Sequence, residues 1–332
     1  MARVLLLQLD GKLPNVALMR LAAHHRARGD ETVLRKAGSE SAACRELGDN
    51  FDRVYASLIF ERTRPVAERV LREYPGAVVG GTGWTSTVAL EDIGVMTLEQ
   101  DYSIYPRFGP SIGFLQRGCR LRCPFCVVPT KEGAMREEQT VMGLWRGAGH
   151  SKHLVILDND FFGNPSWRER VREIRDGNFR VNFTQGINAR FLTEETAGAI
   201  ASVDYRATDF RTRRIYTAWD NRKDGARLMR GLGMLADAGV KPTHIMVYML
   251  IGYWAGETHE DREARRLALR EFGARPYPMP YRRSRDLIAY QRWVLGGYDK
   301  SVPWRTWMDA RAEPRRLDIR ETAQTRLPLV AP

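Results

Sequence analysis

The sequence predicts an α/β protein with parallel sheets, divided into two folded domains and a basic C-terminal extension. Short apolar runs alternate with helical patterns along most of the chain, as in strands joined by helical crossovers. The chain has 332 residues, 43% of them hydrophobic, which is enough to bury the cores of two ordinary domains. We expect a small Rossmann-like α/β domain over residues 1–95, a larger α/β domain over 96–275 and an extension over 276–332.

The first domain is expected to be a small parallel sheet with helices between its strands. A proline opens its first helix and Gly29 follows the end of that helix. The glycine run at 80–83 lacks the helix and lysine of a P-loop, so we expect a plain turn there. His24 and His25 fall within the first helix, and we expect both to face solvent. The expected strands are 4–9, 32–34, 53–60 and 77–79, and the expected helices are 14–28 and 65–74.

The second domain repeats the alternation with longer helices. Its strands end in polar residues, and the carboxyl ends of parallel strands are where α/β proteins gather their sites. The expected strands are 111–116, 154–157, 180–183, 214–218 and 244–251, followed by a proline-stiffened extended run at 275–280. The expected helices are 164–175, one starting at Thr193, 224–238 and 260–272.

Three of the four cysteines lie within eight positions, with the spacing Cys-x3-Cys-x2-Cys at Cys119, Cys123 and Cys126. Three thiolates on one short loop can bind three irons of an iron–sulfur cluster and leave the fourth iron open to another ligand. The alternative is a zinc site or buried thiols. Zinc favours four Cys or His ligands in separated pairs, and the nearest histidines, His150 and His153, are far along the chain. The spacing therefore favours a cluster.

The cysteine motif resembles that of the radical S-adenosylmethionine (SAM) superfamily, with the aromatic Phe125 before the third cysteine and similar flanks at 113–118 and 127–129. The resemblance implies a 4Fe-4S cluster on the three cysteines, bound SAM, an external one-electron donor and a 5′-deoxyadenosyl radical. It implies a partial (β/α)6 barrel over 96–275, preceded by a cobalamin-binding-like domain. The Asp-x-His-x-x-Gly motif of cobalamin ligation is absent, so no cobalamin is expected.

By the same resemblance, polar groups at the strand ends would hold SAM. Arg190 suits the methionyl carboxylate, which a guanidinium can bind with two parallel hydrogen bonds. Glu257 lies in a Gly-Glu-Thr ending similar to that of the fifth strand of the superfamily. The cofactor-binding residues expected are Phe125, Asp158, Asn159, Asp160, Gln185, Asn188, Arg190, Asp220, Asn221 and Gly252.

The substrate expected is a nucleobase. The segments 186–190, 218–221 and 280–283 resemble a bacterial and phage branch of radical SAM proteins, some linked to DNA base hypermodification of an isomerase-like kind. The net charge is +12, and residues 265–320 hold 14 Lys and Arg against 6 Asp and Glu. Arginines suit phosphates, although a solvated basic surface would have the same composition. We expect Tyr281, Arg282 and Arg283 to contact the substrate, a nucleic acid or nucleotide.

Other functions remain open from the sequence. A methylthiotransferase-like enzyme would need a second cluster on N-terminal cysteines, where only Cys44 occurs. A metabolite or peptide radical SAM enzyme shares the same motif. A nucleic-acid-binding protein with a structural cluster is the non-enzymatic alternative. The longest apolar run, 245–254, is too short to span a bilayer, so we expect a cytoplasmic protein without membrane partners.

Overall fold

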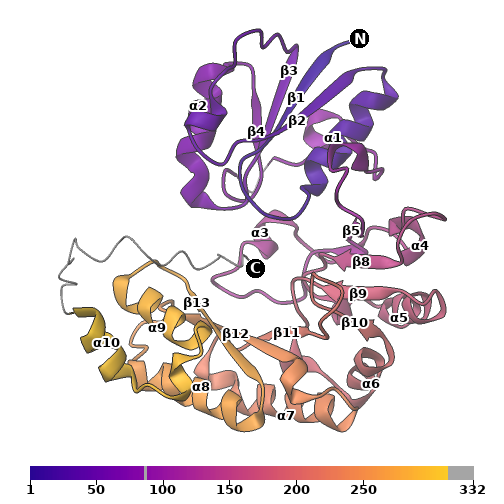
Figure 1. Ribbon diagram of the computed structural model, residues 1–332. Helices are drawn as coiled ribbons and strands as arrows, with labels where there is room; N and C mark the ends of the chain where they lie inside the picture. Colours follow the sequence, from indigo (N-terminus) through magenta and orange to yellow (C-terminus); the bar gives the residue numbers. More distant parts are fainter. Residues whose placement is uncertain (86–87, 313–332) are drawn as a thin grey trace, which may run out of the picture.

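The computed structural model describes residues 1–85 and 88–312. Its first sheet contains β1 (Arg3–Gln8), β2 (Glu31–Lys36), β3 (Arg53–Ser57) and β4 (Val78–Gly80), in the order β2-β1-β3-β4 with every pairing parallel. Helices α1 (Val16–Ala27) and α2 (Arg64–Glu73) connect the strands and lie on opposite sides of the sheet (Figure 1). The expected small parallel sheet with helices between its strands is therefore present in this part of the chain.

The expectation that both histidines of α1 face solvent is wrong for His25. This side chain is 1% exposed, with Nδ1 2.8 Å from Asp30 Oδ2 and Nε2 3.2 Å from the hydroxyl of Tyr55. Burial requires polar atoms to find partners, and His25 has one for each ring nitrogen. It joins the end of α1 to the sheet.

The second part of the chain contains two further parallel sheets. One has the order β10-β9-β8-β5 and the other the order β11-β12-β13. Beyond the end of β9, the N–H of Ile187 donates to the carbonyl oxygen of Tyr216 in β11 at 2.8 Å, which links the sheets. The strands are β5 (Ser111–Gly113), β8 (His153–Ile156), β9 (Arg180–Phe183), β10 (Asp204–Tyr205), β11 (Ile215–Ala218), β12 (Ile245–Ile251) and β13 (Arg275–Pro280).

Helices cover one side of these two sheets, and the largest hydrophobic core lies between them and the strands. α6 and α8 each begin with a capping box, on Thr193 and Thr258, in which the threonine and a residue of the first turn satisfy each other's backbone N–H. α7 and α8 lie along one side of β11 and β12 (Figure 1). The helices are α5 (Trp167–Asp176), α6 (Glu194–Ser202), α7 (Gly225–Asp237), α8 (His259–Phe272), α9 (Arg285–Leu295) and α10 (Trp304–Ala312).

Short elements that the pattern did not predict surround the cysteines. An antiparallel pair, β6 (Gln116–Arg117) and β7 (Arg136–Glu137), encloses them together with α3 (Val128–Lys131). α4 (Val141–Leu144) follows. The expected first strand at 111–116 is therefore split into β5 and β6.

The two α/β parts contact each other through a shared cluster and two polar links. Met19 of α1 packs with Ile112 and Val155 of the second part. The buried Tyr105 donates to Gln8 Oε1 at 2.9 Å, and Lys131 Nζ donates to Thr82 Oγ1 at 2.6 Å. The glycine run at 80–83 therefore contacts the helix that follows the cysteines.

Parallel strands alternating with helices confirm the predicted α/β class. The expected boundary between 275 and 276 falls inside β13, which pairs along its length with β12. α9 packs against this strand through Leu287 and Tyr290, which belong to the main core. Residues 313–332 of the expected extension lie outside the described residues. Within residues 1–85 and 88–312, no helix is both long and apolar enough to cross a membrane.

Candidate functional site

The three clustered cysteines occupy the loop between β6 and α3, at the carboxyl end of β5. All three are free thiols and half-buried. The loop turns between the second and third cysteines, where Cys126 N–H donates to Cys123 O at 3.0 Å. The N–H of Leu121 lies 3.4 Å from Cys119 Sγ and donates to it. Burial raises the pKa of Cys119 and of Cys123, which favours the neutral thiols over the thiolates that a metal would bind.

Glu132 ties the two ends of this loop together. Its Oε2 accepts the N–H of Gly118 at 3.0 Å and the side-chain amide of Asn159 at 3.1 Å, and Arg117 Nε lies 3.5 Å from the same oxygen. Gly118 is required here because its φ is +83° and a Cβ would lie 2.6 Å from the carbonyl oxygen of Ala134. The sequence did not single out Glu132, and only its position six residues after the last cysteine could have suggested it.

Asp158 and Asp160 support the cysteine loop from the end of β8. Both are 3% exposed. Asp158 Oδ1 accepts the N–H of Leu115 at 2.8 Å and of Gln116 at 3.3 Å, and burial raises the pKa of this carboxyl to about 7. Asp160 pairs with Arg120 at 2.9 Å, although burial raises its pKa, and its carbonyl oxygen accepts from the side chain of Gln116. These two carboxylates therefore fix the chain just before Cys119 and just after it.

Arg190 extends from the short 3-10 turn Ala189–Phe191 to the second cysteine. Its guanidinium donates from Nη1 to Asp224 Oδ2 at 2.6 Å and from Nε to Asn188 Oδ1 at 3.1 Å, and it is close enough to Cys123 to oppose the rise that burial causes in the pKa of that thiol. Asp224 and Cys123 help to raise the Arg190 pKa against the opposing effect of burial, so the group stays charged. Asn188 thus positions Arg190, and Asp224 is a further residue that the sequence pattern missed.

Asp220 lies near the same group, just beyond the end of β11. Burial raises its pKa to about 6, and the charges of Arg190 and Arg265 oppose that rise. The carboxyl of Asp220 also raises the pKa of the Cys123 thiol, so both side chains are close to that cysteine. Arg190 and Asp220, which follow two different strands, are therefore both near Cys123.

Gly252, Asn221 and Gln185 have other surroundings. The N–H of Gly252 donates to Glu257 Oε2 at 2.5 Å, and Glu257 pairs in turn with the buried Arg265, so this ending closes a loop. Asn221 caps a short turn by accepting the N–H of Lys223 at 3.0 Å. Gln185 is exposed beyond β9, and the structure gives no hydrogen bond to its side chain within the described part.

An aromatic chain leads from the cysteine loop to the end of β13. The ring of Phe125 lies 5.4 Å from that of Tyr253, which lies 4.7 Å from that of Tyr281. Both contacts are edge-to-face, the geometry that ring quadrupoles favour. Arg282 and Arg283 follow Tyr281 and are exposed. The three expected substrate residues therefore lie beside the site, joined to it by Tyr253, which the sequence did not single out.

The donor set of this loop fits an iron–sulfur cluster in kind. It offers three free, half-buried thiols on one loop, a backbone donor at one sulfur and a cation at another. Across residues 1–85 and 88–312, however, no three His, Cys, Asp or Glu side chains are grouped so as to hold a metal ion. Binding a cluster thus has to draw the three thiols closer together.

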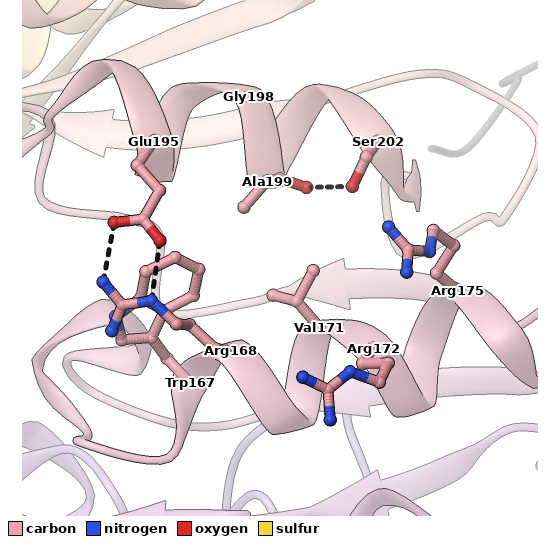
Figure 2. Close-up of a pocket in the computed structure, with 9 residues that line it drawn as sticks. All are labelled: Trp167, Arg168, Val171, Arg172, Arg175, Glu195, Gly198, Ala199 and Ser202. Carbon is pink, nitrogen blue, oxygen red and sulfur yellow. Dashed lines mark hydrogen bonds and ion pairs between the residues drawn. The ribbon is translucent and has the colours of Figure 1, made fainter.

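A separate groove of about 320 Å³ lies between α5 and α6, on the helical side of the sheet (Figure 2). Arginines of α5 line it, and Arg168 forms two hydrogen bonds of 2.6 Å with Glu195 across the groove. Figure 2 also shows the hydroxyl of Ser202 donating to the carbonyl oxygen of Ala199 at 2.8 Å, a hydrogen bond within α6. The groove contains no cysteine or aspartate, so we place the functional site at the cysteine loop.

No protein-family model matches this chain, and no curated protein matches it either.

Proposed function

We propose that this chain is a radical SAM enzyme that modifies or rearranges a substituent of a nucleobase. The observation that carries the proposal is the position of Cys119, Cys123 and Cys126 on one supported loop at the carboxyl end of a parallel sheet. Ligands of α/β proteins bind at that edge. The strands of the two linked sheets, β5-β8-β9 and β11-β12-β13, would form the partial (β/α)6 barrel of that superfamily.

The three cysteines would hold a 4Fe-4S cluster, and the open iron would bind SAM. When bound and reduced by an external donor, the cluster and SAM supply a 5′-deoxyadenosyl radical that abstracts hydrogen from the substrate. Arg190 lies beside Cys123 and keeps its charge, which suits the methionyl carboxylate of SAM. Asp220 provides a carboxyl on the same side, which suits the amino group of SAM once the residue is ionised.

The surroundings of the loop would also restrict side reactions of a radical. Asp158 and Glu132 use their oxygens on backbone N–H groups, so they fix the loop and leave the ligand positions to sulfur. Phe125 and Tyr253 provide an apolar wall next to the thiols. A dry, fixed site favours a reactive radical over side reactions.

A nucleobase substrate is supported by charge and by rings. Arg282, Arg283 and Arg285 are exposed, and none of them has an acidic partner within the described residues. Unpaired arginines beside an exposed tyrosine can bind phosphate and stack a base. A base in a duplex would have to be flipped out or presented in a single strand to reach the loop.

Anaerobic reconstitution with iron and sulfide tests the proposal. We expect about four iron atoms per chain, and a change in the electron paramagnetic resonance spectrum of the reduced cluster when SAM is added. Iron binding and the spectral change on adding SAM should both be lost in each of Cys119→Ala, Cys123→Ala and Cys126→Ala. Cys44→Ala should keep both. Incubation with DNA, nucleotides, peptides or free metabolites should give 5′-deoxyadenosine and an altered base only with the first two.

Zinc in the purified protein, or a cluster spectrum that SAM leaves unchanged, would contradict the radical enzyme. About eight irons per chain would favour the methylthiotransferase-like alternative. Turnover of a peptide or a metabolite, but of no nucleic acid or nucleotide, would contradict the nucleobase substrate and leave the proposed cofactors standing.

A further inference from the structure

One face of the sheet β11-β12-β13 is only partly covered. In β12 the residues Ile245, Val247, Met249 and Ile251 are all 0% exposed, because they pack against helices in the main core. The alternate residues Met246, Tyr248 and Leu250 are half-buried on the opposite face. Parallel sheets are normally covered on both faces, so a half-covered face in this sheet calls for an occupant.

Three tyrosines, which we call the tyrosine row, lie side by side on that face, one from each strand: Tyr216, Tyr248 and Tyr277. The rings of Tyr216 and Tyr248 are stacked, 5.7 Å apart with an angle of 3° between their planes. The ring of Tyr277 lies 5.3 Å from that of Tyr248, and these two residues are register partners. No hydroxyl of the row has a hydrogen-bond partner within the part of the chain that the structure describes.

The tyrosine row leads toward the cysteine loop along β13. Met279 follows Tyr277 on the same side of β13, with the buried Pro278 between them, and Tyr281 comes directly after the strand, where its N–H still donates to Ile251 O of β12 at 2.9 Å; Met279 is 44% and Tyr281 47% exposed. Tyr281 then contacts Tyr253, which contacts Phe125 of the loop. Side chains two and four positions apart in a strand share a face, so this is one surface.

Positive charge borders this surface where β13 ends. Arg282, Arg283 and Arg285 occupy four consecutive positions with one serine, all exposed. By contrast, the neighbouring Arg262 pairs with Asp286 at 2.9 Å, and Arg266 and Arg270 both pair with Asp299. The rim therefore has a local excess of unpaired positive charge, which complements a chain of phosphates better than a single one.

We infer that the tyrosine row and the arginine rim at 282–285 bind a single-stranded polynucleotide, with one base against the tyrosines and its flanking phosphates on the arginines. The rings provide a stacking surface, and the free hydroxyls can donate to or accept from the edge of the base. This inference rests on the proposed function, since it names how the substrate of the same site is held. Its test measures binding alone and needs neither SAM nor turnover.

The probe is a fluorescein-labelled ten-nucleotide thymidine strand, and its binding to the full chain is followed by fluorescence anisotropy without SAM. Tyr248→Leu and Tyr277→Leu should each weaken binding about 10-fold. Tyr248→Phe keeps the ring and should stay within about 3-fold of the parent chain. The matched control is Tyr298→Leu, an exposed tyrosine that packs on Trp307 instead, and it should not change affinity.

The salt dependence of binding distinguishes phosphate contacts made by the arginine rim from attraction by positive charge elsewhere on the protein. Arg282→Ala with Arg283→Ala should reduce the slope of log affinity against log salt concentration by about 1.4, since each phosphate contact on a single strand contributes about 0.7. Arg172→Ala with Arg175→Ala removes two exposed positive charges from α5 and should leave the slope unchanged.

Equal affinity of the parent chain and the tyrosine variants would overturn the inference, as would equal slopes for the two double variants. Thymidine monophosphate binding as tightly as the ten-nucleotide strand would overturn the polynucleotide as occupant. If the strand binds as expected but no 5′-deoxyadenosine ever forms, the proposed radical chemistry fails while this binding surface stands.

Discussion

The backbone N–H of Gly118 donates to the carboxylate of Glu132 at 3.0 Å, across the whole cysteine loop. Gly118 directly precedes Cys119, and Glu132 follows Cys126 by six residues. The same carboxylate oxygen accepts from Asn159, so the loop is closed on itself and fastened to the end of β8.

Glu132→Gln should therefore loosen the loop. The amide keeps one acceptor but loses the charge that strengthens these hydrogen bonds, which are worth about 1.5–3 kcal/mol each when one partner is charged. We expect a lower free energy of unfolding by about 2 kcal/mol and several-fold faster loss of iron to a chelator. Glu137→Gln changes an exposed glutamate of β7 and should have neither effect. Iron retention equal to that of the parent chain would argue against the clamp.

Arg190→Lys should reduce SAM affinity about 10-fold while keeping the positive charge. Lysine cannot form the two parallel bonds of a guanidinium, nor can it contact Asp224 and Cys123 together. Calorimetric titration of the reconstituted protein with SAM measures the change. Arg168→Lys, in the groove between α5 and α6, is the control. Unchanged affinity in the Arg190 variant would assign the SAM carboxylate to another residue.

Gly231→Ala should displace Arg190 without touching the site. A Cβ at Gly231 of α7 would lie 1.9 Å from the carbonyl oxygen of Ala189, at the start of the turn that carries Arg190. Overpacking of this kind costs about 1–3 kcal/mol of stability, and SAM affinity should fall with it. In the same helix a Cβ at Gly233 meets nothing within 4 Å, so Gly233→Ala should stabilise the protein by up to about 1 kcal/mol. Equal effects of the two variants would contradict this role for the turn.

Asp158 should make stability depend on pH. Its pKa rises from 3.8 to about 7 on folding, so the folded state holds a proton that the unfolded state has lost between these values. The free energy of unfolding should therefore fall as the pH rises from about 4 to about 7, by up to about 4 kcal/mol, and change little above that from this group.

Asp158→Asn should remove that fall, because asparagine does not titrate. The hydrogen bonds should persist, since the amide oxygen can still accept from the N–H groups of Leu115 and Gln116. At pH 8 the variant should be about 1–3 kcal/mol more stable than the parent chain. Urea unfolding at several pH values measures both curves. A variant that keeps the parent's pH dependence would show that another group causes it.

The sequence predicted the strands of the second domain other than the two-residue β10 and the β6–β7 pair to within a few residues, because buried parallel strands leave apolar runs that polar loops interrupt. It also predicted that polar side chains at the strand ends gather at the edge of the sheet that carries the cysteines, and Arg190 and Asp220 both lie near Cys123. It could not show that the Asp158 carboxylate accepts backbone N–H groups or that Asp160 pairs with Arg120. That use arises only when burial removes water and every donor needs a partner.

The sequence did not predict the tyrosine row either, because burial in the fold, and not hydropathy, distinguishes its residues. The run over β12 is apolar at every position, so hydropathy does not reveal that Tyr248 lies on a different face from Val247 and Met249. The alternation of the two faces along β12 is visible only in how deeply each side chain is buried. Glu132 and Asp224 were hidden because their partners are distant in sequence.

The hydrogen bond from Lys131 to Thr82 has a mechanical consequence. Lys131 ends α3; burial lowers the pKa of its ammonium, and the charge of the adjacent Glu132 opposes that fall. The chain just after Cys126 is thus braced by a residue almost fifty positions earlier. Hence a displacement of the N-terminal domain would also shift the chain that follows the three cysteines, and a rigid contact between the domains becomes a condition for keeping these thiols in place.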